Sequence, residues 1–460
     1  MTRKHAISCS LALCFGAVTA WAAPPKVIQV PAPRGSNSAG ASARIQVGKG
    51  VGPAWAPLKA QNNLSAATNQ LLTKEKSSAG GTFSSPGIKN GTVDTIPYFN
   101  SWFVTGSRNS IYTYSMVGHS PKAGGTTLIN NMLIPLQIAL LDANSNVVAF
   151  FDPTGGSCGP GSDISLTGDS PIYNIATYPG GSGLPSDAGQ FTDTHMRAQF
   201  NSIRAGNWHT SLNKPLNVCT DLGANNHVWS VGLNPSAWVY LTDQNNNIIG
   251  EAADVNVMGQ IFSEVLAGED ATFHDVPNNT IPVILTDSLP AFDPSNQTCC
   301  ILGFHTAQVG LEDPNGILVY AWATFLPPGN IFSPNANVSV LSHEMDELFN
   351  DPFVNTAVAP WVDGAVQFAQ ANLETADVIE AMSPADALFP VTLNTPGNGT
   401  VTYTVQNSAN LAWFTRNPLN GGVYSWPNTH TLSQCAHVLS PTQNWCYGEG
   451  SAGFFFGPPY

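Results

Sequence analysis

Positive charge is scarce in this chain. Its 460 residues include 16 Lys and Arg against 30 Asp and Glu, and together these make up 10% of the sequence. A protein that binds nucleic acid gathers Lys and Arg to neutralise phosphates, and no such cluster appears in the sequence. We therefore predict that the chain has no nucleic-acid partner.

Long apolar runs are missing after the N-terminus. A helix that spans a membrane needs about 20 mostly apolar residues in a row, and no segment beyond residue 22 supplies them. Residues 1–22 have the pattern of a secretory signal peptide, with a basic start, an apolar stretch from Ala6 to Val18 and the small-residue site Ala20-Trp21-Ala22. The sequence predicts a secreted protein, extracellular or periplasmic, with no membrane association after signal removal.

Cysteine is sparse, with 8 residues in the whole chain, and two of these lie in the predicted signal peptide. The others are Cys158, Cys219, Cys299, Cys300, Cys435 and Cys446. An even number in an exported protein indicates disulfide bonds. We expect Cys435 to pair with Cys446. We expect Cys299 and Cys300 each to pair elsewhere, because disulfide geometry favours Cα atoms that are farther apart than those of neighbouring residues. The sequence does not fix the remaining pairs.

Glycine and proline, by contrast, are abundant. The 42 Gly and 35 Pro, in a chain that is 43% hydrophobic, indicate many turns around a sizeable core. Apolar segments on both sides of Asp142-Ala143-Asn144-Ser145 predict a hairpin, and the same pattern recurs around Asp243-Gln244-Asn245-Asn246. Continuous apolar stretches at 281–285 and 317–325 predict buried strands.

These patterns predict an α+β fold in two parts after the signal peptide. Residues 23–92, rich in Pro, Gly and Ser, are expected to form a low-complexity leader or pro-segment. Residues 93–250 are expected to form a β-rich domain. Residues 251–460 are expected to form a second domain that carries one helix at 337–349 and another from about residue 368 to 382.

The stretch from Ser342 to Pro352 has the residue spacing of a metal site. On the helix predicted for 337–349, His343 and Glu347 are four residues apart and therefore share one face. Glu344 follows the histidine, where HExxH metalloproteases keep their general base. The second histidine of that motif is a glutamate here, which gives HExxE.

A catalytic zinc site usually has three protein ligands and one position for water. The HExxE motif supplies two ligands, and we predict Glu374, in the second helical segment, as the third. Asp377 is placed to orient His343 through its other ring nitrogen. Asp351 and His305 are the alternative ligands. The expected cofactor is one Zn2+ ion, although two glutamate ligands also suit another divalent metal.

Other histidines and the tryptophans have simpler interpretations. We expect His195, His209 and His227 to be core or surface residues rather than ligands. Aromatic residues in a strand-rich protein usually pack in the core, and we expect this of Trp413 and Trp426. A carbohydrate or peptide groove is the alternative for the tryptophans.

The motifs together resemble a known group of proteins. Ser-His-Glu-x-x-Glu followed by Asn-Asp-Pro, then Trp361-Val362-Asp363-Gly364 and Glu374-x-Ala376-Asp377, is similar to the zincin-like core of secreted bacterial proteins with an HExxE motif (gluzincin-like). It is similar, more weakly, to the plant EXORDIUM or phosphate-induced group. The stretch from Cys299 to His305 resembles the Cys-Gly-aromatic-His segment before the HExxE helix of those proteins. Thr375 and Val378-Ile379 depart from the pattern, where a bulky aliphatic residue and Leu-Cys often stand.

The resemblance covers mainly residues 297–380 and implies an extracellular protein with a metallopeptidase-like fold. A β-rich N-terminal part would be followed by a zincin-like part, with an active-site helix and a second ligand helix. The site carried over by the resemblance consists of His343, Glu344, Glu347, Glu374 and Asp377.

The predicted function is that of a secreted zinc-dependent metallopeptidase acting on a protein or peptide substrate. Glu344 would take a proton from the metal-bound water and pass it to the leaving amine. The alternative is a non-catalytic extracellular or cell-wall-associated binding protein on a zincin-like scaffold. A third class, a glycan-active enzyme with paired carboxylates, is supported by Glu344, Glu347 and the tryptophans alone. The sequence does not fix the oligomeric state.

Overall fold

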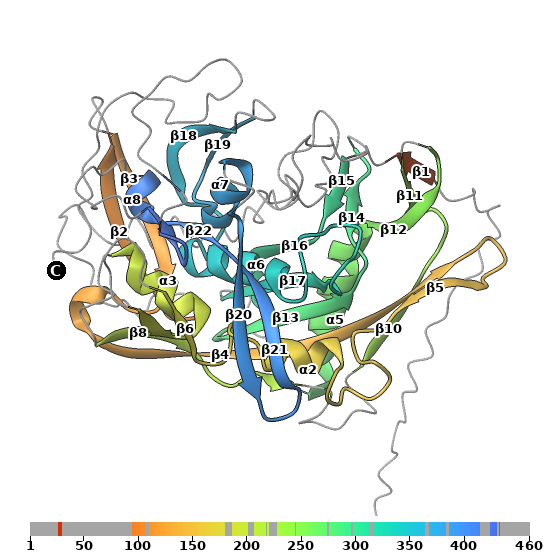
Figure 1. Ribbon diagram of the computed structural model, residues 1–460, viewed down its shortest axis with the longest axis horizontal. Helices are drawn as coiled ribbons and strands as arrows, with labels where there is room; N and C mark the ends of the chain where they lie inside the picture. Colours follow the sequence, from red (N-terminus) through yellow and green to blue (C-terminus); the bar gives the residue numbers. More distant parts are fainter. Residues whose placement is uncertain are drawn as a thin grey trace, which may run out of the picture.

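Figure 1 shows the fold in a computed structural model of the chain. The structure describes residues 26–29, 94–105, 110–179, 186–200, 207–217, 219, 228–243, 245–273, 276–295, 298–311, 316–363, 368–382, 386–414, 424–429 and 432. The predicted signal peptide, nearly all of the predicted leader, His227 and the expected Cys435–Cys446 pair therefore lie outside the described residues.

A mixed sheet forms the centre of the molecule. Its main path runs in the order β10-β4-β13-β17-β16, and β5, β8 and β9 also pair with β4. These strands are β4 (Gly125–Leu141), β5 (Val147–Phe151), β8 (Trp208–Leu212), β9 (Leu216–Asn217), β10 (Trp229–Leu233), β13 (Thr280–Asp287), β16 (Gly303–Val309) and β17 (Ile317–Phe325). The two buried strands predicted from continuous apolar runs are confirmed as β13 and β17, and every residue of β17 is buried.

Helices cover both faces of this sheet. Alternate residues of β17 enter two separate cores: Val319 and Ala321 pack with α6 (Ser339–Asn350), whereas Tyr320 and Trp322 pack with α5 (Val255–Phe273). Side chains on a strand point to opposite faces in turn, so one strand can serve both cores. Figure 1 shows α6 lying across β16 and β17.

Smaller sheets and helices surround this centre. The second sheet, in the order β1-β11-β12-β14-β15, consists of β1 (Lys26–Gln29), β11 (Trp238–Thr242), β12 (Ile248–Asp254), β14 (Ala291–Asp293) and β15 (Thr298–Ile301). The two-stranded sheets are β2 (Tyr98–Thr105) with β3 (Ser110–Val117), β6 (Ala176–Tyr178) with β7 (Asp187–Gly189), β18 (Ala357–Asp363) with β19 (Phe368–Asn372), β20 (Leu388–Thr395) with β21 (Gly399–Gln406), and β22 (Ser408–Ala409) with β23 (Ser425–Trp426). The other helices are η1 (Pro121–Ala123), α2 (Asp163–Gly168), α3 (Phe191–Gln199), α7 (Thr375–Met382) and α8 (Leu411–Phe414).

The predicted fold class is wrong. We expected an α+β chain with a β-rich first part and a separate zincin-like second part, but the structure is strand-rich and its central sheet joins both parts. β4, from the first part, pairs in parallel with β13, from the second, and Ile134 lies opposite Ile284. The second ligand helix is also shorter than expected, because residues 368–372 form β19 and α7 begins at Thr375. Parallel strands pair across long stretches of chain, and local sequence patterns carry no information on which strands pair.

Both predicted hairpins are present as β4–β5 and β11–β12. Their turns are built in the same way. The Asp142 carboxylate accepts hydrogen bonds from the backbone amides of Asn144 and Asn146, each at 2.8 Å. Asp243 accepts from Asn245 at 2.8 Å and from Asn247 at 2.9 Å. An aspartate that closes its own turn explains why these two sequence patterns look alike.

Two disulfides lie among the described residues. Cys158 pairs with Cys219, and their Cα atoms are 6.2 Å apart. Cys299 pairs with Cys300, so the expectation that each would pair elsewhere is wrong: the peptide bond between them is cis, and their Cα atoms lie 3.0 Å apart. Within the described ranges, no helix is both long and apolar enough to cross a membrane.

Candidate metal centre

The HExxE helix is buried on all sides. α6 begins at Ser339 and ends at Asn350, and all 12 of its residues are buried. Leu341, Met345 and Leu348 recur at helical spacing and belong to the hydrophobic core. The opposite face, which carries His343 and Glu347, meets β16 and α7. The acidic side chains of this helix are therefore enclosed by protein.

His343, Glu344 and Glu347 point toward the segment where β16 and the start of α7 converge. The Nε2 atom of His343 lies 3.3 Å from Oε2 of Glu347. The same atom lies 3.6 Å from Oδ1 of Asp377, whereas the predicted role of Asp377 requires a contact with the other ring nitrogen, Nδ1. The sequence-predicted residues of the helix and of α7 are thus brought together.

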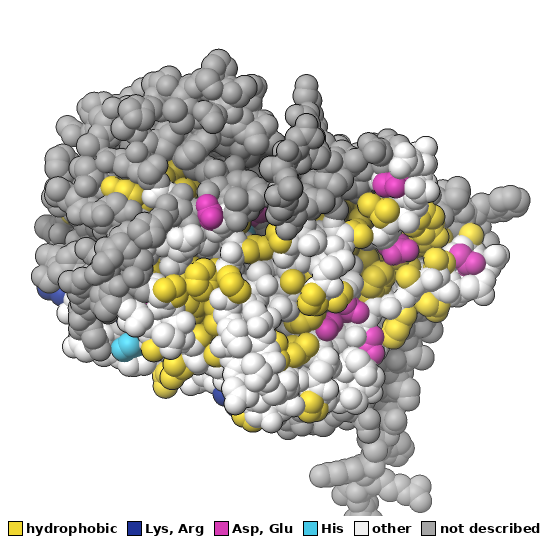
Figure 2. Space-filling model, viewed as in Figure 1, with side chains coloured by type: hydrophobic (Ala, Val, Ile, Leu, Met, Phe, Trp, Pro, Cys, Tyr) yellow, Lys and Arg dark blue, Asp and Glu magenta, His cyan; other side chains and the backbone are white. Residues whose placement is uncertain are grey.

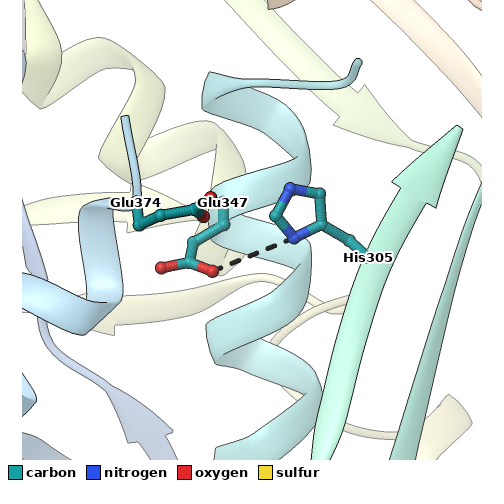
Figure 3. A group of neighbouring side chains, drawn as sticks. All are labelled: His305, Glu347 and Glu374. Atoms are coloured by element: carbon teal, nitrogen blue, oxygen red, sulfur yellow. Dashed lines mark ion pairs between the residues drawn. The ribbon is translucent and has the colours of Figure 1, made fainter. Parts of the chain in front are cut away.

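His305, an alternative ligand from the sequence, enters the same cluster from β16. Its Nδ1 atom lies 3.4 Å from Oε2 of Glu344 and 3.8 Å from Oε2 of Glu347. In Figure 3 the His305 ring points toward Glu347, and the Glu374 side chain reaches the same place from the segment before α7. The neighbouring Phe304 packs in the core on the other face of the sheet, so strand alternation turns His305 toward α6.

The donors form two compact groups that share one carboxylate. His305, Glu347 and Glu374 make one group, and His343, Glu344 and Glu347 make the other, with one donor atom from each residue within 4.8 Å of the others. The predicted set was His343, Glu347 and Glu374. Here Glu374 falls in the group with His305, while His343 falls in the group with Glu344.

Glu347 is held in place by the backbone of α7. Its Oε1 atom accepts hydrogen bonds from the amides of Ala376 at 3.1 Å and Asp377 at 3.2 Å. The first amides of a helix have no partner within that helix, so a carboxylate from another element can cap them. Oε1 is thereby occupied, and Oε2 is left facing the two histidines.

Asp351, the other alternative ligand, is engaged elsewhere. Its Oδ1 accepts from the Thr356 hydroxyl at 2.9 Å and from the Asn355 amide at 3.2 Å, and its Oδ2 accepts from the Thr356 amide at 2.9 Å. The Asp351 carboxylate therefore closes the loop after α6, and it belongs to neither group of possible metal ligands among the described residues.

Several oxygens of the cluster lack a partner. Among the described residues, no hydrogen-bond donor meets Oε1 of Glu344, Oε2 of Glu347 or either oxygen of Glu374. Each of these side chains is at most 1% exposed. Leaving a buried polar atom without a partner costs about 1–3 kcal/mol, and more for a charged group, so four such atoms in one place indicate that a ligand or protons complete them.

Burial and mutual repulsion shift the pKa of each group toward its neutral form. Burial raises the pKa of Glu344 well above its usual value, and the charge of Glu347 adds to this. Burial also raises the pKa of Glu374, next to Glu347, with which it can share a proton. Burial lowers the pKa of His343 to about 4 and that of His305 to about 3. Both imidazoles are therefore neutral near pH 7, the form in which histidine binds metals.

The spacing of the donors suits a small divalent ion. Two atoms bound to one tetrahedral Zn2+ at about 2.0–2.1 Å lie roughly 3.3–3.4 Å from each other. The His343–Glu347 distance of 3.3 Å is of this size, and the His305–Glu347 distance, at 3.8 Å, is longer. Two neutral imidazoles and several carboxylates are a donor set that zinc accepts.

Sequence reasoning missed a second buried polar group beside this centre. His195 of α3 contacts Asp346 of α6, and the Thr375 hydroxyl donates to the same carboxylate at 2.7 Å. Asp346 is the second variable residue of HExxE, and its charge could have indicated a partner. Its link to His195 spans 151 positions of sequence and follows from the fold alone.

The other residues interpreted from sequence belong to neither donor group. His195 is fully buried and hydrogen-bonded, as expected of a core histidine, and His209 contacts Asp193 at 3.0 Å. Trp413 and Trp426 are fully buried, which confirms them as core residues and removes them from any groove.

On the face shown in Figure 2, Lys and Arg side chains are few and lie apart.

Comparison with known proteins adds no relative: the chain matches no protein-family model, no curated protein and no solved structure. The resemblance to secreted HExxE proteins and to the EXORDIUM group therefore stays a prediction.

Proposed function

We propose that this protein is a secreted, zinc-dependent hydrolase of the metallopeptidase type, acting on a protein or peptide substrate. One observation carries the proposal. Two buried histidines and three buried glutamates, from β16, α6 and the segment before α7, direct their donor atoms at one another. Four of the glutamate oxygens meet no hydrogen-bond donor among the described residues. The ligands would be drawn from His305, His343, Glu347 and Glu374, and another divalent metal could replace zinc.

Within this proposal each side chain has its own task. A bound zinc ion supplies Lewis acidity and lowers the pKa of a coordinated water. The two imidazoles are neutral and ready to bind, and α7 fixes the Glu347 carboxylate. Glu344 takes a proton from water and passes it to the leaving amine. Burial raises the pKa of Glu344, which makes its carboxylate a stronger base than an exposed one.

Replacing Glu344 by Gln separates the base from the ligands. The amide has nearly the same size but takes no proton, so we expect Glu344→Gln to retain zinc while hydrolysis of a casein-type substrate falls at least about 100-fold. The measurements are elemental analysis of the purified protein and an assay with and without chelator. A wild-type protein that holds no metal after expression in zinc-rich medium would contradict the proposal.

The burial of the cluster favours a second candidate. Structural zinc sites are closed, whereas catalytic ones keep a position open to water, and each candidate ligand here is at most 1% exposed. The alternative is therefore a non-catalytic extracellular or cell-wall-associated binding protein in which the ion stabilises the fold. Tightly bound zinc with no turnover, and binding to cell-wall polysaccharide, would favour this candidate.

A further inference from the structure

The buried carboxylate of Asp346 lies beside the metal centre and outside the ligand groups. Its Oδ2 accepts a hydrogen bond from the Thr375 hydroxyl at 2.7 Å, and its Oδ1 contacts Nδ1 of His195. All three side chains are fully buried. Hydrogen bonds to a carboxylate are stronger than those between neutral groups, so this chain of contacts joins α3, α6 and α7.

The chain of contacts is coupled to the ligands through the backbone. Asp346 immediately precedes Glu347, and Thr375 immediately follows Glu374. On the other side of Glu347, the amides of Ala376 and Asp377 bind its Oε1. α6 and the start of α7 are thus joined twice: Glu347 forms one junction itself, and Glu374 immediately precedes the other, at Thr375.

We propose that the hydrogen bonds from Thr375 and His195 to Asp346 position Glu374 against Glu347 and thereby set the affinity of the centre for its ion. This inference rests on the proposed metal site. Thr375 and His195 are positioning residues, because neither belongs to a ligand group. Residues that orient metal ligands typically change metal affinity 10–100-fold when removed. A shift of well under 1 Å at Glu374 changes the donor spacing that zinc requires.

The test uses Thr375→Val, which keeps the shape of the side chain and removes the donor. Zinc alone is titrated into the metal-free full chain in competition with a chromophoric chelator. We expect Thr375→Val to weaken zinc binding about 10–100-fold, and Thr375→Ser, which restores a hydroxyl, to bring it back to within about threefold of the wild type.

Thr356→Val provides the matched control. Thr356 also donates its hydroxyl to a buried aspartate of the same region, Asp351, at 2.9 Å, but it is not adjacent to a ligand. We expect this variant to lose stability and to bind zinc as the wild type does. Should Thr375→Val fail to fold, Asp346→Asn, which keeps an acceptor of the same size, takes its place with the same criterion.

The outcomes distinguish this inference from the proposed function. Unchanged zinc affinity in Thr375→Val, or equal weakening in Thr356→Val, overturns the positioning role while the metal site stands. A wild-type chain that binds no zinc overturns both. Weakening in Thr375→Val, with recovery in Thr375→Ser and an unaffected Thr356→Val, supports the positioning role.

Discussion

At the scale of single residues, Glu347 and Asp351 show how hydrogen bonding decides which carboxylate can bind an ion. They lie one helical turn apart. Asp351 has both oxygens satisfied by the loop that follows it. Glu347 has one oxygen bound to two amides of α7 and the other facing the histidines. Both side chains are carboxylates, and their ability to bind an ion differs because their hydrogen-bond partners differ.

His305 gives the clearest prediction at this scale. We expect His305→Ala to weaken zinc binding at least about tenfold, because the substitution removes one imidazole donor from the centre. His209→Ala is the control, since His209 is a partly exposed histidine paired with Asp193. The measurement is zinc titration against a chelator. Equal affinity in His305→Ala and the wild type would remove His305 from the ligand set.

Much of this centre could be predicted from the local spacing of its residues, but the position of His305 could not. His343, Glu344 and Glu347 lie within one helical turn and a half, so a helix alone brings them together. Glu374 follows by analogy with a second ligand segment. His305 reaches the cluster because β16 lies under α6, a contact that arises from sheet pairing and has no local signal.

At the scale of elements, the close approach of α6 to the sheet depends on Gly303. A Cβ atom at this position would lie 2.8 Å from both the carbonyl oxygen of Trp322 and Cγ1 of Val340, and 2.9 Å from Cγ of Glu344. Any side chain larger than hydrogen would therefore push the helix away from β16 and β17. His305, two residues further along the same strand, would then lose its distance to Glu344.

We expect Gly303→Ala to lower the free energy of unfolding by about 1–3 kcal/mol, the usual cost of overpacking. Gly259→Ala is the matched control: Gly259 lies in α5, and a Cβ atom there meets nothing within 4 Å. In a helix this change stabilises by roughly 0.5–1 kcal/mol. Denaturant unfolding measures both variants, and a neutral Gly303→Ala would contradict the close packing.

The strands show the same limit on prediction as the site. The apolar runs of β13 and β17 and the two aspartate-closed hairpins follow from composition and period. The pairing of β4 with β13 could not be predicted, because parallel partners lie far apart in sequence. The error in fold class came from this pairing, which joins the two parts we expected to be separate.

At the scale of the whole molecule, the cluster links stability to pH. In the metal-free protein, Glu344, Glu347 and Glu374 have pKa values raised by burial and by one another. The folded state then holds protons that the unfolded state releases above about pH 4.5, so stability falls as pH rises. His305 and His343, with pKa values lowered to about 3 and about 4, oppose this trend only below their unfolded value of 6.5.

Above pH 6.5 these two histidines therefore do not oppose the fall in stability with rising pH. We expect the Tm of metal-free protein, prepared by refolding with a chelator, to fall between pH 7 and 8.5, because the free energy of unfolding falls by up to about 1.4 kcal/mol per pH unit for each proton held. The zinc-loaded protein should fall less, because bound ligands are already deprotonated. A Tm difference between the two forms that stays constant over this range would contradict the prediction.

A second pair of acidic residues, Asp163 and Asp287, is the reason for comparing the metal-free form with the zinc-loaded form. Burial, followed by the neighbouring Asp287, raises the pKa of Asp163 to about 8. Asp163 also lowers the stability as pH rises. It does so in both the metal-free and the zinc-loaded protein, so its effect cancels from the difference between their Tm values.

The enclosure of every candidate ligand also determines how long a bound ion stays in the centre. An ion surrounded by side chains at most 1% exposed leaves only when the protein opens, so its residence time is set by the rate of that opening. Affinity and residence time then become separate properties of this centre. A chain that captured its zinc while folding would keep that same ion through many hours in a metal-poor medium, and its metal content would record where it folded.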